Sequence, residues 1–163
     1  MSEELVERYA LGGELLTYAA QGLSAEHLHA RPGPGDWSPM ELIAHLCDSD
    51  LVASDRMKRV IAEENPPLLA YDESAWIARL HPHGLSAEDA VALFAQNRRW
   101  TASILRQCGP EDFARAGMHS ENGRKTLADL VTTYINHLDY HLRYLYGKRS
   151  NLGVAIYPRY SSD

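Results

Sequence analysis

The sequence predicts an all-α protein, a four-helix bundle, from three observations. Apolar residues recur every three or four positions along four long segments, which is the period of an amphipathic helix. Three of these segments begin with the Ser or Thr signals that cap helix N-termini. Patterns that predict strands are nearly absent. With 163 residues, the chain is long enough to bury a core, so we expect a single domain over residues 1–163.

The first helix is expected over about residues 3–21, where Leu5, Tyr9 and Leu16 lie on one apolar stripe. The segment 31–35 has the sequence Arg-Pro-Gly-Pro-Gly. It predicts a turn, because repeated proline and glycine interrupt regular structure. The first helix is therefore expected to end before this turn.

The second helix has the clearest start in the chain. Residues 38–41, Ser-Pro-Met-Glu, form a capping box with proline at the first helical position. Trp37 and Leu42 are placed to pack against each other across that helix start. We expect the helix to run to about Glu63 and to end at the two prolines of residues 66–67.

A long connection over residues 65–85 follows the second helix, with a short helix expected near 73–80. Antiparallel neighbours in a bundle usually need only about 2–8 connecting residues. The length therefore predicts a crossover, after which the third helix runs parallel to the second. The third helix is expected to begin at the cap Ser86 and to stop at Gly109.

The fourth helix follows a second long connection, which is rich in Gly, Asn and Ser around residues 117–125. A capping signal at Thr126 predicts its start. Its end is expected at Tyr146, because Gly147 is the residue type that commonly follows a helix. Residues 148–163 are expected to form a tail.

Charge and composition narrow the possible partners and the compartment. The net charge is -6, and acidic and basic residues are interleaved without a basic stripe, so we expect no nucleic-acid partner. No apolar stretch approaches the roughly 20 residues that span a bilayer, so we expect no membrane association. The only cysteines, Cys47 and Cys108, are far apart and are expected to be reduced thiols in the cytoplasm.

Eight histidines occur, and two of them are four residues apart on the predicted fourth helix. That spacing places His137 and His141 on one helix face, one turn apart, where both imidazoles can reach a single ion. They fall on or beside an apolar stripe that includes Tyr134 and Leu138. A metal pair is one interpretation, and two core histidines hydrogen-bonded to their neighbours is the other.

His45 adds a third inward-facing imidazole, from the second helix. Three histidines can hold a divalent ion and leave one coordination position open, as catalytic sites do. The alternative is a hydrogen-bonded core histidine. Asp48, one turn later, is a candidate general base or orienting carboxylate, or else an exposed helix acid. His119 precedes the fourth helix and could lie over the site, so Asp48 and His119 are the candidate catalytic residues.

These residues make the chain resemble the DinB/YfiT-like superfamily over nearly its whole length. The resemblance implies a four-helix bundle in up-down-down-up order. It also implies one divalent metal ion, typically Zn or Ni, on His45, His137 and His141, and a homodimer as a common assembly. The matching pieces are Arg31-Pro32, residues 35–38, His45 with Asp48, Arg56, residues 67–76, His119 with Gly123, and His137 with His141.

The resemblance also implies metal-dependent chemistry on small molecules. Relatives include transferases that use bacillithiol, mycothiol or glutathione, a mycothiol-dependent maleylpyruvate isomerase and hydrolases. We expect transfer of a low-molecular-weight thiol to an electrophile, in detoxification or stress defence. The alternatives are a metal-dependent small-molecule hydrolase and a non-catalytic metal-binding stress protein. Arg56 and Arg98 could meet carboxylates of a thiol cosubstrate, although exposed helix arginines are the plainer interpretation.

Overall fold

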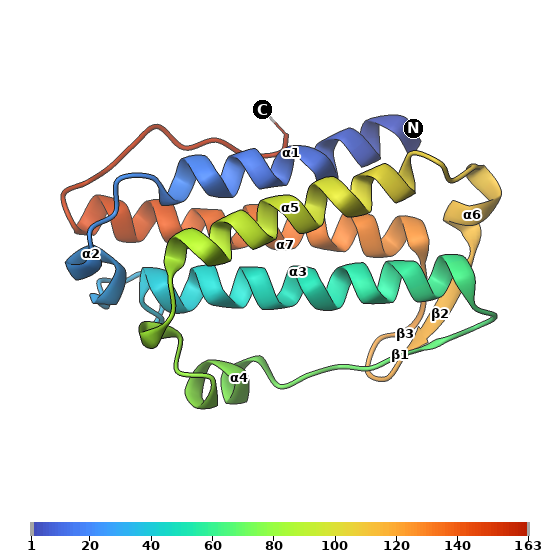
Figure 1. Cartoon of the computed structure of the whole chain (residues 1–163), viewed down its shortest axis with the longest axis horizontal. Helices are drawn as coiled ribbons and strands as arrows, with labels where there is room; N and C mark the ends of the chain where they lie inside the picture. Colours follow the sequence, from blue (N-terminus) through green and yellow to red (C-terminus); the bar gives the residue numbers. More distant parts are fainter. Residues whose placement is uncertain (1, 163) are drawn as a thin grey trace.

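Four long helices form the bundle in the computed structural model, which describes residues 2–162. Figure 1 shows that the first and last of these helices run in one direction and the middle two in the opposite direction. The predicted up-down-down-up order is therefore confirmed. The four helices are α1 (Ser2–Ala20), α3 (Pro39–Ala62), α5 (Ala87–Leu105) and α7 (Leu127–Asn151).

The parallel arrangement of α3 and α5 requires the chain to return along the length of the bundle. This crossover passes beneath α3 in Figure 1 and contains the short helix α4 (Glu73–Arg79) and the 3-10 turn η1 (Pro82–Gly84). Two further short helices, α2 (Ala25–His29) and α6 (Pro110–Ala114), lie at opposite ends of the bundle. The crossover places α4 beside the first half of α3, which carries the predicted ligand His45 (Figure 1).

A small three-stranded sheet covers one end of the crossover and was not expected from the sequence. Its strands are β1 (Pro67–Leu68), β2 (Ala116–His119) and β3 (Gly123–Thr126), in the order β1-β2-β3. β1 pairs with β2 in parallel, and β2 pairs with β3 as an antiparallel hairpin. Strands this short contain too few residues to show the alternation by which strands are recognised. The long connection expected around residues 117–125 therefore contains a hairpin that the sequence did not predict.

The end of α7 also differs from the prediction. The helix passes through Gly147 and continues to Asn151, and Gly153 then adopts a positive φ of 76° after the helix end. A Cβ atom at position 147 would lie 2.7 Å from Cδ of Pro34. Gly147 thus permits close approach of the loop before α3, and Gly153 provides the left-handed residue that ends the helix.

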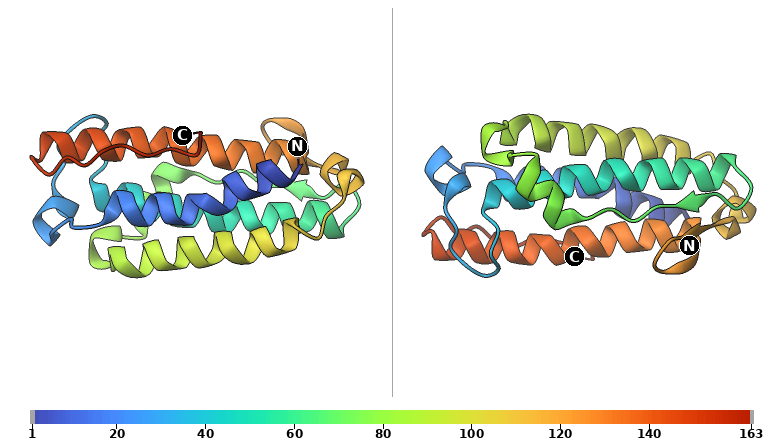
Figure 2. Two further views of the ribbon diagram at one scale, coloured as in Figure 1. Left: turned by 90° about the horizontal axis from the view of Figure 1, so that it is seen from above. Right: turned by 90° about the horizontal axis from the view of Figure 1, so that it is seen from below.

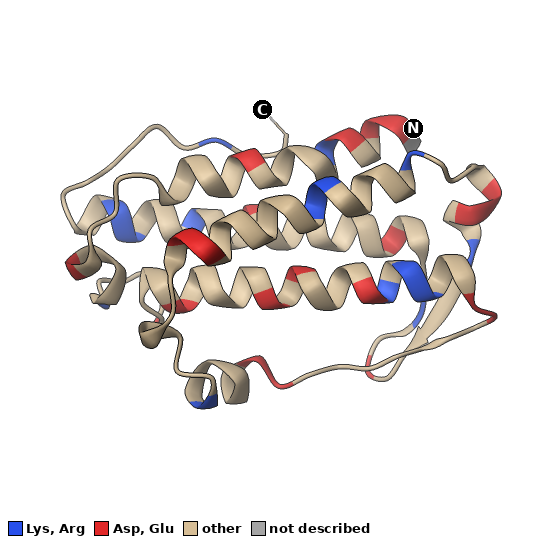
Figure 3. Ribbon diagram, in the orientation of Figure 1, with Lys and Arg blue, Asp and Glu red and all other residues tan. Residues whose placement is uncertain are grey.

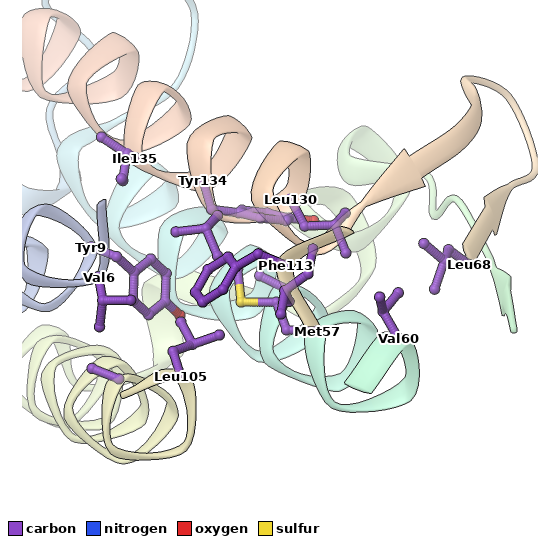
Figure 4. Close-up of a cluster of buried hydrophobic side chains, with 14 residues drawn as sticks. Val6, Tyr9, Met57, Val60, Leu68, Leu105, Phe113, Leu130, Tyr134 and Ile135 are labelled. Atoms are coloured by element: carbon purple, nitrogen blue, oxygen red, sulfur yellow. The ribbon is translucent and has the colours of Figure 1, made fainter. Parts of the chain in front are cut away.

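The apolar core consists of two clusters along the bundle. One lies at the end with the sheet and includes Tyr9, Met57, Phe113 and Leu130 (Figure 4). The other fills the opposite half, around Leu16, Leu42, Phe94, Leu138 and Leu142. Burial of these side chains, each contributing roughly 1.5–3 kcal/mol, supplies the main stabilisation of the bundle.

Arg98 and Asp50 form an ion pair inside the bundle. Arg98 is 1% exposed, and its Nε donates to Oδ1 of Asp50 at 2.8 Å. Its terminal nitrogens donate to the backbone carbonyls of Tyr9 and Tyr134 at 3.2 and 2.7 Å. Asn97 donates to the second carboxylate oxygen of Asp50 at 2.7 Å. The interpretation of Arg98 as an exposed helix residue is therefore wrong, because its side chain is buried and ion-paired inside the bundle.

The residues after α7 return along the outside of the bundle, as Figure 2 shows. The backbone amide of Ser161 donates to Asp139 of α7 at 3.0 Å, and Tyr18 of α1 donates to the carbonyl of Tyr157 at 2.9 Å. Each of the four long helices carries both acidic and basic residues (Figure 3). Within residues 2–162, no helix has the length and apolarity that a membrane crossing requires.

Candidate metal centre

The first ligand candidate, His45, is fixed by the start of α3. Oγ of Ser38 accepts the backbone N–H of Glu41 at 3.1 Å, and the Glu41 carboxylate accepts that of Ser38 at 2.8 Å, as the predicted capping box requires. His45 lies on the second turn after this cap and is 2% exposed. The cap therefore sets the position from which the imidazole enters the bundle.

The histidines of α7 meet His45 from the neighbouring helix. Nε2 of His45 lies 3.1 Å from Nε2 of His137 and 3.1 Å from Nε2 of His141. All three nitrogens lie within 4.8 Å of one another. The residues predicted from the four-residue spacing on one helix and from the single histidine on another are thus brought together at one point.

Burial keeps these three imidazoles in the neutral form. It lowers the pKa of His45 and of His141 to about 4, and the nearby His141 depresses that of His45 further. The pKa of His137 falls to about 2, first through burial and then through the neighbouring histidines and Arg98. Neutral imidazole is the form that binds a metal ion.

The geometry fits a divalent ion better than mutual hydrogen bonding. An N–H of one ring can point at only one of its two neighbours, so three nitrogens directed at a common point cannot all pair with each other. Zn–N bonds of about 2.0–2.1 Å in a tetrahedral site place two ligand nitrogens roughly 3.3 Å apart. The observed separations of 3.1 Å are close to that value.

Trp37 covers one side of the three histidines. Its ring centroid lies 4.9 Å from that of His45 and 6.3 Å from that of His141, and it is nearly parallel to the latter. From the sequence, Trp37 was predicted only to pack against Leu42 at the start of the helix, and no role beside the histidines was expected. A neighbouring aromatic ring restricts water and fixes the orientation of the imidazoles, so this residue also belongs to the site.

The crossover brings Glu73 to the histidines, and the sequence prediction did not include it. Glu73 begins α4, and its Oε2 lies 3.9 Å from Nε2 of His45, with half of the side chain exposed. Partial burial and then the nearby Asp72 raise the pKa of this carboxyl. The sequence contained only an indirect indication, namely that Asp72 is suited to cap α4 and so to place Glu73 on its first turn.

A cavity of about 370 Å³ opens beside His137. Its wall includes Tyr71 from the crossover, whose hydroxyl is hydrogen-bonded to Ser49 of α3. Burial raises the pKa of Tyr71 to about 12, so its hydroxyl remains protonated and can donate. The other lining residues include Glu73 and His119. The three-histidine cluster is thus adjacent, through His137, to a space large enough for a small molecule.

The structure places His119 in this cavity wall, at the end of β2. Its Nδ1 accepts the backbone N–H groups of Glu121 and Asn122 at 3.2 and 3.3 Å. The proton of the neutral ring therefore resides on Nε2, which makes that atom a donor. His119 thus shares a cavity wall with His137, and its catalytic role stays a prediction.

Asp48 and Asp50 lie on α3 near His45 but have different surroundings. Within the described chain, Asp48 has no hydrogen bond or ion pair with the three histidines, and partial burial raises its pKa. Its proposed role as a general base stays a prediction. Asp50 is ion-paired with Arg98.

Cys47 is a buried free thiol. Burial raises its pKa to about 12, which makes it a poor nucleophile.

Arg56 also lies inside the protein, contrary to the interpretation of an exposed helix residue. It is 8% exposed and lines the cavity beside His137. One terminal nitrogen donates to the hydroxyl of Tyr134 at 2.7 Å, and the other donates to the carbonyl of Leu69 in the crossover. Arg56 therefore links α3, α7 and the crossover around the cavity.

Fold and site together define a four-helix bundle whose central histidines can bind a metal beside a small-molecule cavity. The model of the DinB superfamily matches residues 9–145 of this chain. A protein of Oceanobacillus iheyensis, provisionally named a metal-dependent hydrolase, is 34% identical over 132 residues. These cover 80% of this chain and 76% of that protein. The chain belongs to the DinB superfamily.

Solved structures show the same fold. YfiT from Bacillus subtilis, described as having an unusual four-helix bundle topology, superposes with a TM-score of 0.87 at 21% identity. The match covers 93% of this chain and 87% of YfiT. A mycothiol-dependent maleylpyruvate isomerase superposes with a TM-score of 0.73 at 13% identity, over 89% of this chain and 60% of the isomerase. These likenesses support the helix order described above.

Proposed function

We propose that this protein is a metal-dependent enzyme that activates water to hydrolyse a small molecule in the cavity beside His137. The convergence of three neutral imidazole nitrogens, one of them on His137 in the cavity wall, carries the proposal. The relative in Oceanobacillus iheyensis, with its provisional name of metal-dependent hydrolase, supports it. His45, His137 and His141 would hold a divalent ion such as Zn or Ni.

A divalent ion held by His45, His137 and His141 would supply Lewis acidity, which lowers the pKa of water toward about 7 and favours the thiolate form of a thiol. The residues of the chain provide the proton transfer. Glu73 is 3.9 Å from Nε2 of His45 and can accept a proton from a nucleophile at the cavity wall. Its raised pKa brings the carboxylate closer to the range in which a general base operates near neutral pH.

Two donors face the cavity and can stabilise negative charge on a reacting oxygen. The Nε2–H of His119 is one, since Nδ1 of that ring is occupied by backbone N–H groups. The protonated hydroxyl of Tyr71 is the other. Donors held in place before the reaction stabilise developing charge without reorganisation, and this effect is commonly the largest contribution to catalysis.

Thiol transfer is the second candidate, with the same three histidines and a low-molecular-weight thiol as nucleophile. Cys47 is buried with a raised pKa, and neither cysteine is among the residues that line the cavity, so the thiol would be a cosubstrate. The name of the mycothiol-dependent isomerase that shares the fold is consistent with such a cosubstrate. Water and a thiol would occupy the same position, so substrate assays separate the two candidates.

The test uses purified protein loaded with Zn or Ni and a panel of activated esters and amides, with and without added thiols. We expect turnover that needs metal, proceeds without thiol and disappears in His137→Ala. Turnover that begins only when a thiol is added, with an aryl halide as electrophile, would instead support thiol transfer. One bound metal ion without turnover in either assay would contradict both and leave a metal-binding protein.

A further inference from the structure

Arg56 carries a buried charge that forms an ion pair with no acid in the part of the chain that the structure describes. Within residues 2–162 its hydrogen-bond partners are a hydroxyl and a carbonyl, its buried Nε has no partner, and it forms no ion pair. Among the other buried arginines, Arg98 is paired with Asp50 at 2.8 Å, whereas Arg149 donates to the backbone carbonyls of Ala19, Gln21 and Val154. Buried charges are normally paired or ligand-bound, because an unpaired ion in the interior is costly. Arg56 differs from both in that its buried Nε has no partner and its side chain lines a cavity, so an anion from outside the chain can supply its counter-charge.

The cavity gives an external anion access to this guanidinium. Arg56 lines it from α3, and Lys125 lines it from β3. Burial lowers the pKa of His119, and the positive charges of Arg56 and Lys125 lower it further. The negative charge of Glu121 raises it. The two cations thus act on the same part of the cavity, the part closed by the β2–β3 hairpin.

Two acids also line the cavity, and neither forms an ion pair with Arg56 or Lys125 within residues 2–162. Glu73 lies at the other end, 3.9 Å from Nε2 of His45, and Glu121 is exposed on the hairpin. Tyr134 lies between the two ends, since its hydroxyl accepts from Arg56 and its ring centroid is 6.0 Å from that of His137. A single small molecule can therefore place an anionic group near Arg56 and a reacting bond near His137.

We propose that the cavity selects small molecules that carry a carboxylate, which Arg56 and Lys125 bind while the reacting bond lies beside His137. The inference rests on the proposed function, whose substrate class it specifies. A singly charged carboxylate matches the one uncompensated guanidinium and its planar geometry. A phosphate dianion would add a second negative charge close to Glu121. The carboxylate belongs either to the substrate or to a thiol cosubstrate.

Binding is measured on metal-free protein in chelator, so that a carboxylate cannot bind through the metal. The probe is 4-phenylbutyrate, followed through the backbone amide NMR signals of Asn122 and Thr133 in the cavity wall. The primary amide of the probe, 4-phenylbutyramide, serves as the neutral analogue. Inorganic phosphate serves as the competing anion. We expect saturable shifts with the carboxylate, at least tenfold weaker binding of the amide, and no tighter binding of phosphate.

Lys125→Gln is the main variant, because Lys125 is half-buried in the hairpin and its loss leaves the bundle core untouched. We expect it to weaken carboxylate binding about tenfold. Arg124→Gln is the matched control. It removes the same charge from the adjacent position of β3, where the exposed side chain points to the opposite face and contacts the carbonyl of Ala114. Arg56→Gln, checked for folding by circular dichroism, should weaken binding at least as much as Lys125→Gln.

The inference would be overturned if Arg124→Gln weakened carboxylate binding as much as Lys125→Gln does. It would also be overturned if the neutral amide bound as tightly as the carboxylate, if phosphate bound more tightly, or if the carboxylate did not bind. These results are obtained without metal, so they are independent of whether the loaded protein hydrolyses anything. In the loaded protein, Lys125→Gln should raise KM for a carboxylate-bearing ester if the substrate carries the group. If the thiol carries it, the variant should raise KM for 3-mercaptopropionate and leave that for 2-mercaptoethanol unchanged.

Discussion

Two buried polar clusters lie next to each other in this bundle, and they differ in how their charges and hydrogen bonds are satisfied. In the first, Arg98, Asp50 and Asn97 satisfy one another, with two backbone carbonyls completing the set. In the second, three histidine nitrogens point at one another and cannot all pair, and the buried Nε of Arg56 has no hydrogen-bond partner among the described residues. The complete cluster stabilises the fold, whereas the incomplete one has the composition of a ligand site.

The largest expected effect tests the complete cluster. Asp50→Ala leaves Arg98 buried without its counter-charge, which should lower the free energy of unfolding by about 3–5 kcal/mol in urea denaturation. Asp55→Ala is the control, because Asp55 forms an exposed pair with Arg59 on the same helix and should cost at most about 1 kcal/mol. Similar losses in the two variants would show that the buried pair contributes no more than a surface pair.

The second prediction concerns the incomplete cluster and its metal. Zinc at about a hundred times its dissociation constant should raise the free energy of unfolding by about 2.7 kcal/mol, because it binds only the folded protein. His137→Ala should remove most of this increase, whereas His29→Ala, which changes an exposed histidine of α2, should keep it. An undiminished zinc effect in His137→Ala would place the ion elsewhere.

The third prediction uses pH on metal-free protein. In the unfolded chain these histidines bind protons below pH about 6.5, whereas in the folded protein their pKa values are about 4 or lower. The unfolded state therefore holds more protons between pH 6.5 and 4, and stability falls as the pH is lowered through this window. The slope should be about 1.4 kcal/mol per pH unit for each histidine.

The variant with alanine at positions 45, 137 and 141 provides the comparison for this slope. In this variant, the free energy of unfolding should fall much less between pH 6.5 and 4, and the remaining fall should be the contribution of the carboxylates. The Asp50–Arg98 pair is present in both proteins and so cancels in the difference. Identical pH profiles of the free energy of unfolding in the two proteins would contradict neutral, buried imidazoles.

The smallest effect on stability is expected at Glu73, which is half exposed beside the histidines. Glu73→Gln should change the free energy of unfolding by no more than about 0.5 kcal/mol. It should slow metal-dependent hydrolysis about 10²–10⁴-fold, because the general base is lost while the metal stays bound. Glu88→Gln, an exposed acid in the first turn of α5, should leave both quantities unchanged. Full hydrolytic activity in Glu73→Gln would exclude Glu73 as the base.

The helices and the histidines were predictable because their causes are local. The capping boxes at Ser38 and Thr126 fix where α3 and α7 begin. The interval between His137 and His141 fixes their shared face, and the length of the crossover predicts the parallel third helix. These features depend on residues a few positions apart, which a single sequence displays.

The missed features depend on contacts between distant segments. Glu73 reaches His45 only because the crossover returns along the bundle, and Arg56 is buried because Leu69 and Tyr134 cover it. The role of Gly147 likewise depends on Pro34, more than a hundred residues earlier in the chain. Helical periodicity gives no information about which loop covers a given arginine or carboxylate.

The most direct test of the metal centre is the metal content of purified, untagged protein, determined by elemental analysis. The wild-type protein, reconstituted with Zn or Ni under reducing conditions, should hold about one ion per chain. The triple alanine variant at positions 45, 137 and 141 should hold none while retaining its helical circular dichroism spectrum. One ion per chain in the folded triple variant, or no ion in the reconstituted wild-type protein, would contradict a three-histidine metal centre.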